Sequence, residues 1–205
     1  MEYAKLGNTD IEVSKLCVGC MSFGKAGTMH KWTLDEEQSG EVIRHALDLG
    51  INFFDTARFY TDSETKIGEA LGDVRENIYI ATNNHVVARD KVVIASKVYF
   101  NPGRLSSAAI HREIEGTLER LGTDYLDLYI IHRFDYHTPI EETMEALNDL
   151  VVSGKVRAIG ASAMYGYQFY NMQLAARDHG WAQFVAMENH YNLLYREDER
   201  ELIPI

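Results

Sequence analysis

Four polar side chains of types that act in acid–base chemistry lie at or just after apolar, strand-like runs: Asp55, Tyr60, Lys97 and His132. A phenol with an ordinary pKa of about 10 is a weak acid at neutral pH, but a nearby ammonium stabilises the phenolate and lowers that pKa. We expect Lys97 to supply this charge and Asp55 to hold the ammonium in place. A histidine beside them can donate a hydrogen bond to the same oxygen. Such a group is suited to polarise a carbonyl and to protonate its oxygen.

Each of these four residues also has an ordinary structural explanation when it is taken alone. A carboxylate after a strand caps a loop or helix, a loop tyrosine packs at a rim, a lysine at a strand end is solvated, and a histidine is satisfied within a core. Their occurrence at matched strand ends, in chain order, favours a shared site, because the carboxyl ends of parallel strands lie on one face of a sheet or barrel.

The elements that position these residues alternate between apolar strands and amphipathic helices. After a β-hairpin around the turn at 7–10, we predict strands at 15–19, 51–57, 91–100, 125–132, 156–162 and 182–191. Helices are predicted between them at 33–50, 62–73, 106–122, 139–154 and 166–180. We expect the first helix to begin with a capping box formed by Thr33 and Glu36. This alternation indicates an α/β protein whose strands pair in parallel through right-handed crossovers, in a sheet or a barrel.

Residues 74–90 break the alternation. Their stretch 75–83, RENIYIATN, resembles 89–97, RDKVVIASK, residue for residue in type. A tandem duplication or an inserted strand explains this likeness, so one copy is surplus to the sheet. We expect the second copy to occupy the sheet because it ends in Lys97, whereas the first ends in Asn83.

The composition is typical of one globular domain, which we place over residues 1–205, with 46% apolar residues. A net charge of −11, with both signs interspersed, disfavours nucleic acids and anionic membranes as partners, because both require a positive face. No apolar stretch approaches the roughly 18 residues that span a bilayer, and the first residues, MEYAKLGNTD, lack the apolar core of a signal peptide. We therefore expect a cytoplasmic protein.

Three other patterns suggest chemistry but have simpler explanations. Cys17 and Cys20 form a lone C-x-x-C, which we interpret as two small apolar side chains at a strand end rather than a redox pair or half a zinc site. The stretch 19–26, GCMSFGKA, nearly matches a phosphate-binding loop, but Ala26 replaces the hydroxyl that holds magnesium. The two histidines of 132–137 have no third ligand, so we predict no metal site.

Several ordered blocks of this sequence together resemble one known family, the aldo-keto reductases: KLCVGCMSFG, GINFFDTARFY, VVIASKV, RLGTDYLDLYIIHRFD, TPIEETMEALNDLVVSGKVRAIGAS and HYNLL. The resemblance covers nearly the whole chain and looks closest to a bacterial branch that is also similar to potassium-channel β subunits. It implies a TIM-like (β/α)8 barrel that binds NADP(H) without a Rossmann domain and reduces aldehydes or ketones. The catalytic tetrad of the family falls on the four residues named first, with Tyr60 as the general acid.

The resemblance also implies cofactor-binding positions, and these match less completely. The family's Ser-Asn pair after the fifth strand, which holds the nicotinamide carboxamide, is Ser162 followed by Ala163 here. The glutamine of the sixth strand is replaced by Glu188, which accepts hydrogen bonds but donates none when ionised. With Asp55, these residues form the expected cofactor site, and we expect weaker or altered NADP(H) binding from the two replacements.

The substrate and the assembly state follow from the same resemblance. Trp32, Arg133 and Phe134 are candidate contacts for a small-molecule carbonyl substrate, because rim aromatics favour apolar groups. The sequence accounts for about six of the eight βα units of the family and reaches Ile205 where a sixth helix is expected to begin. Open strand edges favour assembly, including a homo-oligomer. A non-catalytic NADP(H)-binding module and an inactive fragment of a reductase are the alternative functions.

Overall fold

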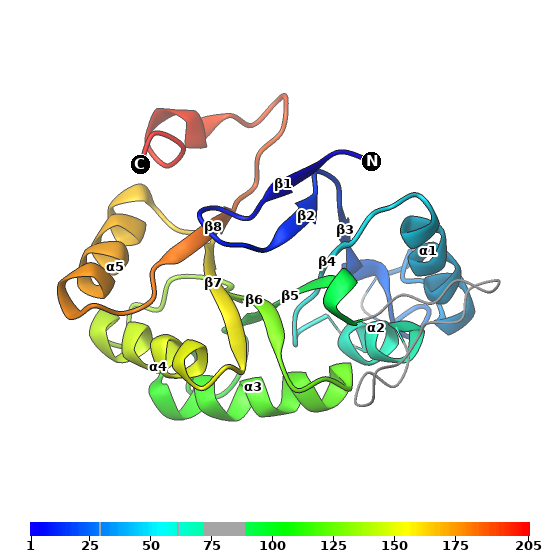
Figure 1. Ribbon diagram of the computed structural model, residues 1–205, viewed down its shortest axis with the longest axis horizontal. Helices are drawn as coiled ribbons and strands as arrows, with labels where there is room; N and C mark the ends of the chain where they lie inside the picture. Colours follow the sequence, from blue (N-terminus) through cyan, green and yellow to red (C-terminus); the bar gives the residue numbers. More distant parts are fainter. Residues whose placement is uncertain (29, 61, 72–88) are drawn as a thin grey trace.

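A curled sheet of parallel strands forms the centre of the molecule in the computed structural model, which describes residues 1–28, 30–60, 62–71 and 89–205 (Figure 1). Six strands pair in the order in which they occur along the chain: β3 (Cys17–Gly19), β4 (Phe53–Asp55), β5 (Val93–Val98), β6 (Leu126–Ile131), β7 (Val156–Ser162) and β8 (Phe184–Glu188). The prediction of an incomplete (β/α)8 barrel with six parallel strands is confirmed.

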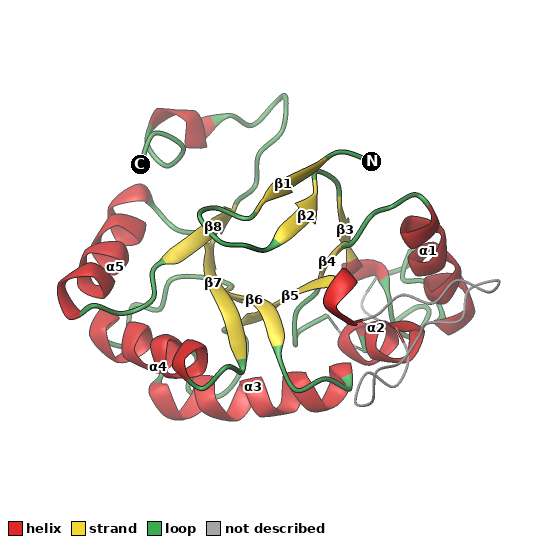
Figure 2. Cartoon of the chain, viewed as in Figure 1, coloured by secondary structure: helices red, strands yellow, loops and turns green. Residues whose placement is uncertain are grey.

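Helices cover the convex face of this sheet (Figure 2). They are α1 (Glu36–Asp48), α2 (Ser63–Leu71), α3 (Ser107–Leu121), α4 (Ile140–Val152) and α5 (Gly166–His179). Their apolar faces pack with strand side chains such as Ile94, Tyr129 and Ile159 in one core. Each large apolar side chain buried there stabilises the fold by about 1.5–3 kcal/mol. The connecting helices therefore hold the curled sheet from outside.

The predicted hairpin, β1 (Tyr3–Lys5) and β2 (Glu12–Ser14), lies across the concave side of the sheet (Figure 1). Ile11 and Val13 pack there against the inward side chains of the parallel strands, in a second apolar cluster with Val93, Ala95, Leu128, Ile130 and Ala158. The hairpin thus supplies the apolar partner that the inner face of the sheet needs near the amino-terminal ends of its strands.

The alternation of side chains along each strand decides which residues reach the opposite end. Successive side chains point to opposite faces, so Lys97 shares the inward face of β5 with Val93 and Ala95. By the same rule, Asp55, Ser162 and Glu188 are the last inward positions of β4, β7 and β8. A layer of polar side chains therefore follows the apolar layers at the carboxyl ends of the strands.

Two local predictions differ from the structure. Helix α1 begins two residues later than the predicted capping box, because Asp35 is its N-cap: the Asp35 carboxylate accepts from the Gln38 amide at 2.9 Å, and the Gln38 side chain accepts from the Asp35 amide. Thr33 is buried, and its hydroxyl accepts from the amide of His30 at 3.1 Å instead. The expected sixth helix is a 3-10 helix over Glu197–Arg200 followed by turns.

Residues 72–88 lie outside the described residues, and with them the whole first copy, 75–83, including Asn83. The second copy is described: after a 3-10 helix over Arg89–Lys91 it forms β5, which carries Lys97 into the sheet. In the described parts of the chain, no helix has the length and apolar character needed to cross a membrane.

Candidate active site

A buried ion pair lies at the carboxyl ends of β4 and β5. The Lys97 ammonium, whose side chain is 0% exposed, donates to the Asp55 carboxylate and, at 3.1 Å, to the carbonyl oxygen of Thr56. The carboxylate of Glu188, at the end of β8, lies 3.3 Å from the same ammonium. Lys97 is therefore surrounded by three acceptor groups from two segments, as a lysine must be if it is to stay charged when buried.

Tyr60 and His132 lie beside this pair. The Lys97 Nζ atom is 5.2 Å from the centroid of the Tyr60 ring. The Tyr60 and His132 rings meet edge to face, with centroids 5.7 Å apart. The turn after β4 fixes the tyrosine through a 2.9 Å bond from its amide to the Ala57 carbonyl, and the His132 amide bonds to Val98 at 2.9 Å. The structure thus brings the four sequence-predicted residues together at one mouth.

The histidine in this cluster is neutral over the usual range of assay pH. Burial, the Lys97 ammonium and the Arg133 guanidinium together lower the pKa of His132 to about 4. A neutral imidazole has one N–H donor and one acceptor nitrogen. His132 can therefore donate a hydrogen bond to a substrate oxygen without bringing a second positive charge to the mouth.

The acidity of Tyr60 differs from the expectation. Its pKa is raised, first by burial and then by the Asp55 and Glu188 carboxylates, although Lys97 lowers it. The prediction that the lysine lowers the pKa of Tyr60 holds for the lysine alone but not for the whole site. Burial also raises the pKa of Asp55 to about 6, against the pull of Lys97. The Lys97 pKa is itself raised by its carboxylate neighbours, which outweigh burial, so we assign the pair as ionised at neutral pH.

A second group of polar atoms lies at the ends of β7 and β8. Ser162 pairs with Glu188 in the sheet register and is buried. The next residue, Ala163, has a φ of +47°, a left-handed conformation that is costly for alanine. Its amide donates to the side-chain oxygen of Asn189 at 3.0 Å. The side chain of Asn189, which follows β8, thus contacts position 163, where the resemblance had led us to expect an asparagine.

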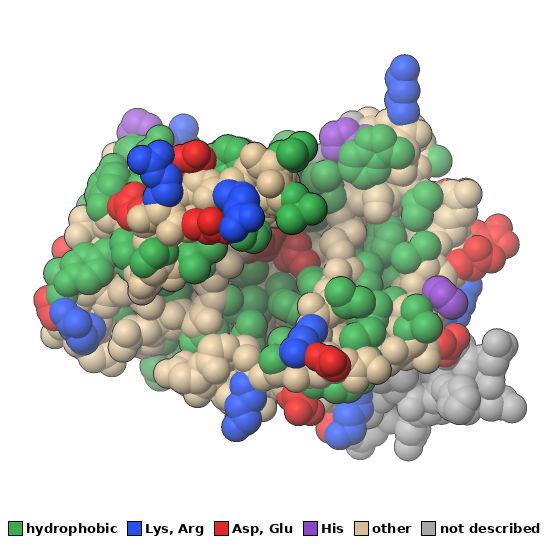
Figure 3. Space-filling model, turned by 90° about the horizontal axis from the view of Figure 1, so that it is seen from above, with side chains coloured by type: hydrophobic (Ala, Val, Ile, Leu, Met, Phe, Trp, Pro, Cys, Tyr) green, Lys and Arg blue, Asp and Glu red, His purple; other side chains and the backbone are tan. Residues whose placement is uncertain are grey.

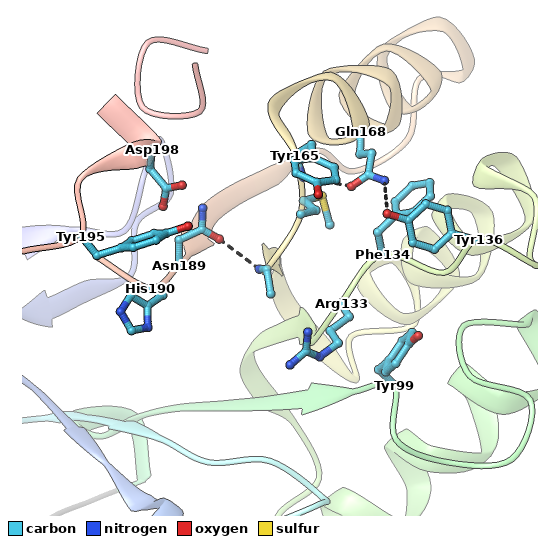
Figure 4. Close-up of a pocket in the computed structure, with 12 residues that line it drawn as sticks. Tyr99, Arg133, Phe134, Tyr136, Tyr165, Gln168, Asn189, His190, Tyr195 and Asp198 are labelled. Atoms are coloured by element: carbon cyan, nitrogen blue, oxygen red, sulfur yellow. Dashed lines mark hydrogen bonds between the residues drawn. The ribbon is translucent and has the colours of Figure 1, made fainter. Parts of the chain in front are cut away.

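A pocket of about 510 Å³ opens beside these atoms (Figure 4). Aromatic side chains from four segments line much of it: Tyr99, Phe134, Tyr136, Tyr165 and Tyr195. It adjoins the four clustered residues through Arg133, which follows His132, and through Asn189, which follows Glu188. Seen from above, the molecule has a hollow near its centre, in which hydrophobic and acidic side chains are visible (Figure 3).

The three predicted substrate residues have different positions. Arg133 and Phe134 line the pocket. Trp32 belongs to the loop after β3, where it is 53% exposed and stacks on His30 with centroids 4.3 Å apart. The structure therefore associates two of the three candidate residues with the pocket and leaves Trp32 outside its lining.

Sequence reasoning missed two aromatic groups and two contacts. The Phe100 ring lies 5.0 Å from the His132 ring, edge to face, and Tyr99 lines the pocket. Both follow Lys97 by two or three residues, a position from which rim contacts were predictable. The Lys97–Glu188 ion pair and the Ala163–Asn189 bond had no comparable signal, because each requires the relative placement of separate strands or turns.

The cysteine pair shows no sign of redox reactivity. Both thiols are free, and burial raises the pKa of Cys17 to about 12, helped by the carboxylates of Asp55 and Glu188. A thiol of that pKa is almost fully protonated at neutral pH and is a poor nucleophile. Across residues 1–28, 30–60, 62–71 and 89–205, no cluster of three or more histidine, cysteine, aspartate or glutamate side chains has a metal-binding arrangement.

Comparison with known proteins adds an independent line of argument. Residues 15–205 match the model of the aldo/keto reductase family. An aldo-keto reductase of Fusarium vanettenii is 42% identical over 99% of this chain and 60% of its own length. A putative aryl-alcohol dehydrogenase of Schizosaccharomyces pombe is 40% identical over 98% of the chain and 63% of its own length. The versiconal hemiacetal acetate reductase of Aspergillus parasiticus is 40% identical over 100% of the chain and 63% of its own length.

The chain therefore spans about three fifths of the length of these relatives. The family match covers nearly all of it, including every strand that contributes to the mouth. With its curled parallel sheet and its polar mouth, this chain belongs to the aldo/keto reductase family.

Proposed function

We propose that this protein reduces aldehydes or ketones to alcohols with NADPH, and that Tyr60 gives the proton to the carbonyl oxygen. The observation that carries the proposal is the position of the Lys97 ammonium, bound to Asp55 and 5.2 Å from the Tyr60 ring centroid. The neutral His132 ring lies at the edge of the same phenol. Family membership makes an oxidoreductase the expected class of enzyme.

The chain's own residues have separate tasks in this proposal. Tyr60 is the general acid, since its hydroxyl gives a proton to the oxygen of the developing alkoxide. Lys97 stabilises the phenolate that remains, and Asp55 keeps the ammonium charged and in place. His132 donates a hydrogen bond that orients the substrate carbonyl. When bound, the nicotinamide supplies the hydride.

The donor set at the ends of β7 and β8 fits a nicotinamide carboxamide, which needs both donors and acceptors. Ser162 offers a hydroxyl that can donate or accept, and Glu188 offers acceptor oxygens. The Asn189 oxygen is used by Ala163, which leaves its amide NH2 for a ligand in the adjoining pocket (Figure 4). We propose these three residues, with Asp55, as the cofactor site, Asn189 replacing the amide absent at position 163. The preference for NADP over NAD and the kinship to the branch that resembles channel β subunits remain predictions.

The pocket suggests an aromatic substrate. Its lining is rich in tyrosine and phenylalanine, whose rings stack on other rings at favourable offsets. Arg133 adds a cation at the same wall, suited to an acidic or hydroxyl substituent. The name of the fission yeast relative, a putative aryl-alcohol dehydrogenase, agrees with this class of substrate. A cytoplasmic location and a homo-oligomeric state also remain predictions, which fractionation and sedimentation would test.

The proposal is tested by Tyr60→Phe in an assay of NADPH oxidation with benzaldehyde and related aryl aldehydes. Loss of a general acid lowers kcat by about 10²–10⁴-fold, whereas a calorimetric Kd for NADPH and the melting temperature should be unchanged. Tyr170→Phe is the matched control, because Tyr170 is exposed on α5, and it should keep full turnover. Undiminished turnover in Tyr60→Phe would exclude the tyrosine as the acid.

The same assay separates two alternatives. A non-catalytic NADP(H)-binding module predicts calorimetric binding of NADPH with no aldehyde-dependent oxidation. An inactive fragment predicts neither binding nor turnover, an outcome that the coverage of three fifths of the relatives makes worth testing directly. The comparison sample for both is the full-length Fusarium vanettenii relative.

A further inference from the structure

Glu188 and Tyr60 both lie beside the Lys97 ammonium. A lysine has three N–H donors. In this site the Lys97 donors are directed to the Asp55 carboxylate and the Thr56 carbonyl, and the Glu188 carboxylate lies 3.3 Å away. The ring centroid of Tyr60 lies 5.2 Å from the same Lys97 Nζ atom. An interaction of Lys97 with Glu188 therefore weakens its interaction with the phenol.

The net charge of the cluster also disfavours the Tyr60 phenolate. Asp55 and Lys97 alone are neutral as a pair, and Glu188 makes the cluster negative by one charge. A negative cluster beside a phenol disfavours the phenolate. The raised pKa of Tyr60, to which burial contributes most and the Asp55 and Glu188 carboxylates also contribute, agrees with this geometry.

We propose that Glu188 is a positioning residue that shares the Lys97 ammonium with Asp55 and thereby restrains Lys97 from stabilising the Tyr60 phenolate. This inference rests on the proposed function for its catalytic meaning, since it concerns the acid assigned there. Its physical content is that the Glu188 carboxylate makes Tyr60 less acidic, and this can be tested without measuring turnover. Glu188 differs from Asp55 in its exposure to solvent, because 45% of its side chain is exposed against 16% for Asp55.

Other charged and titratable groups also face the cluster, and a test must separate Glu188 from them. They come from β3 and the turn after it, β4 and the loop after it, β5, and the segment after β6: Cys17, Cys20, Asp55, Tyr60, Lys97, His132 and Arg133. His132 is neutral above pH 5 and the Cys17 thiol is protonated up to about pH 11, given pKa values of about 4 and about 12. Glu188 is the exposed carboxylate of the group, so its charge can be removed without dismantling the buried pair.

The experiment measures the acidity of Tyr60 directly. Protein labelled with ¹³C at the tyrosine ring carbon that bears the hydroxyl is titrated by NMR without cofactor, and the Tyr60 signal is assigned by its absence in Tyr60→Phe. Glu188→Gln keeps the size of the side chain and removes its charge, so the Tyr60 pKa should fall by about one unit. Glu188→Asp keeps the charge but withdraws it from Lys97, so a smaller fall is expected.

Glu37→Gln is the matched control, because it removes the same charge from an exposed position in the first turn of α1 and should leave the Tyr60 pKa unchanged. Circular dichroism at each pH restricts the comparison to folded protein. Titration of Tyr60 in Glu188→Gln at a pH where the wild-type tyrosine is still protonated supports the inference. Identical behaviour of Tyr60 in the wild type and Glu188→Gln up to the pH of unfolding overturns it.

The kinetic consequence distinguishes this inference from the proposed function. If the Tyr60 pKa falls in Glu188→Gln, the alkaline limb of the kcat profile for aldehyde reduction should move to lower pH by the same amount. A fall in the Tyr60 pKa together with full turnover in Tyr60→Phe would retain the role of Glu188 and reject the tyrosine as the acid. An unchanged Tyr60 pKa with catalysis that depends on Tyr60 would reject the role of Glu188 alone.

Discussion

The two ends of the curled sheet each hold a buried carboxylate bound to cations, and they differ in how the charges balance. At the amino-terminal end, Asp127 accepts from the Ile94 amide at 3.0 Å and pairs with Arg157 at 3.0 Å and Arg89 at 2.8 Å. At the carboxyl end, Asp55 and Glu188 share Lys97. In the first cluster two guanidinium groups share one buried carboxylate, with the exposed Asp10 carboxylate 3.5 Å from Arg157, whereas in the second two carboxylates share one cation.

This difference is the one we expect between a structural cluster and the proposed catalytic cluster. Both oxygens of Asp127 have donors, and its side chain is 1% exposed, so its charge is fully compensated by the fold. The Asp55 carboxylate is 16% exposed and depends on an ammonium that a second carboxylate also contacts. In barrels of this type, groups at the carboxyl end serve chemistry, whereas those at the amino-terminal end serve stability.

The largest effect is expected when each buried carboxylate is removed in turn. Asp127→Ala leaves two guanidinium groups without their buried partner and should destabilise the protein by about 3–5 kcal/mol. Asp55→Ala should cost less, about 1–2 kcal/mol, because Lys97 keeps Glu188 and the Thr56 carbonyl as acceptors. Urea unfolding followed by circular dichroism measures both. Equal losses would show that the two ends do not differ in the way proposed.

A smaller effect is expected in the pH dependence of stability, through the titration of His132. Because the folded-state pKa of His132 is about 4, below the ordinary value of about 6.5, the unfolded chain binds the proton first as the pH falls. The titration of His132 therefore does not change the free energy of unfolding above about pH 6.5. It lowers that free energy progressively as the pH falls from 6.5 to 4. Comparison with His132→Gln, which cannot titrate, should show the wild type losing about 1–3 kcal/mol relative to the variant over this window. Parallel curves for the two proteins would contradict the lowered pKa.

The smallest predicted effect is at the rim of the mouth. Ala163 has a φ of +47°, which costs alanine about 1 kcal/mol and which asparagine tolerates better. Ala163→Asn should therefore stabilise the protein by about 0.5–1 kcal/mol, measured as a rise in melting temperature. Ala26→Asn, at an exposed alanine outside the positive-φ region, is the control and should change stability by less than about 0.5 kcal/mol. A larger gain in the control would assign the effect to asparagine itself.

The parts that could be predicted from the sequence depend on local periodicity. The strands and helices follow from alternation along the chain, and the pair of Asp55 with Lys97 follows because β4 and β5 are neighbours in register. The contact of Lys97 with Glu188 joins β5 and β8, which are separated by two strands in the sheet, so it depends on how strongly the sheet curls. No periodicity encodes that curvature.

The acidity of Tyr60 was not predictable for a related reason. One favourable neighbour, Lys97, is visible in the sequence pattern, but burial and the second carboxylate act only once the mouth is assembled. The N-cap of α1 is a second feature that depends on tertiary packing and not on the local sequence alone. Thr33 and Asp35 are both suitable N-caps, and the burial of Thr33, which follows from tertiary packing, decides between them.

The hairpin at the start of the chain has a consequence for water. Ile11 and Val13 seal the concave side of the sheet below Lys97, whose side chain is itself fully shielded from solvent. The hairpin therefore covers Lys97 on the side of the amino-terminal ends of the strands, and the polar cluster lies toward the carboxyl ends, next to the pocket. A ligand bound over this end of the sheet would cover the partly exposed carboxylates of Asp55 and Glu188. It would thereby slow the exchange of protons between the cluster and bulk water.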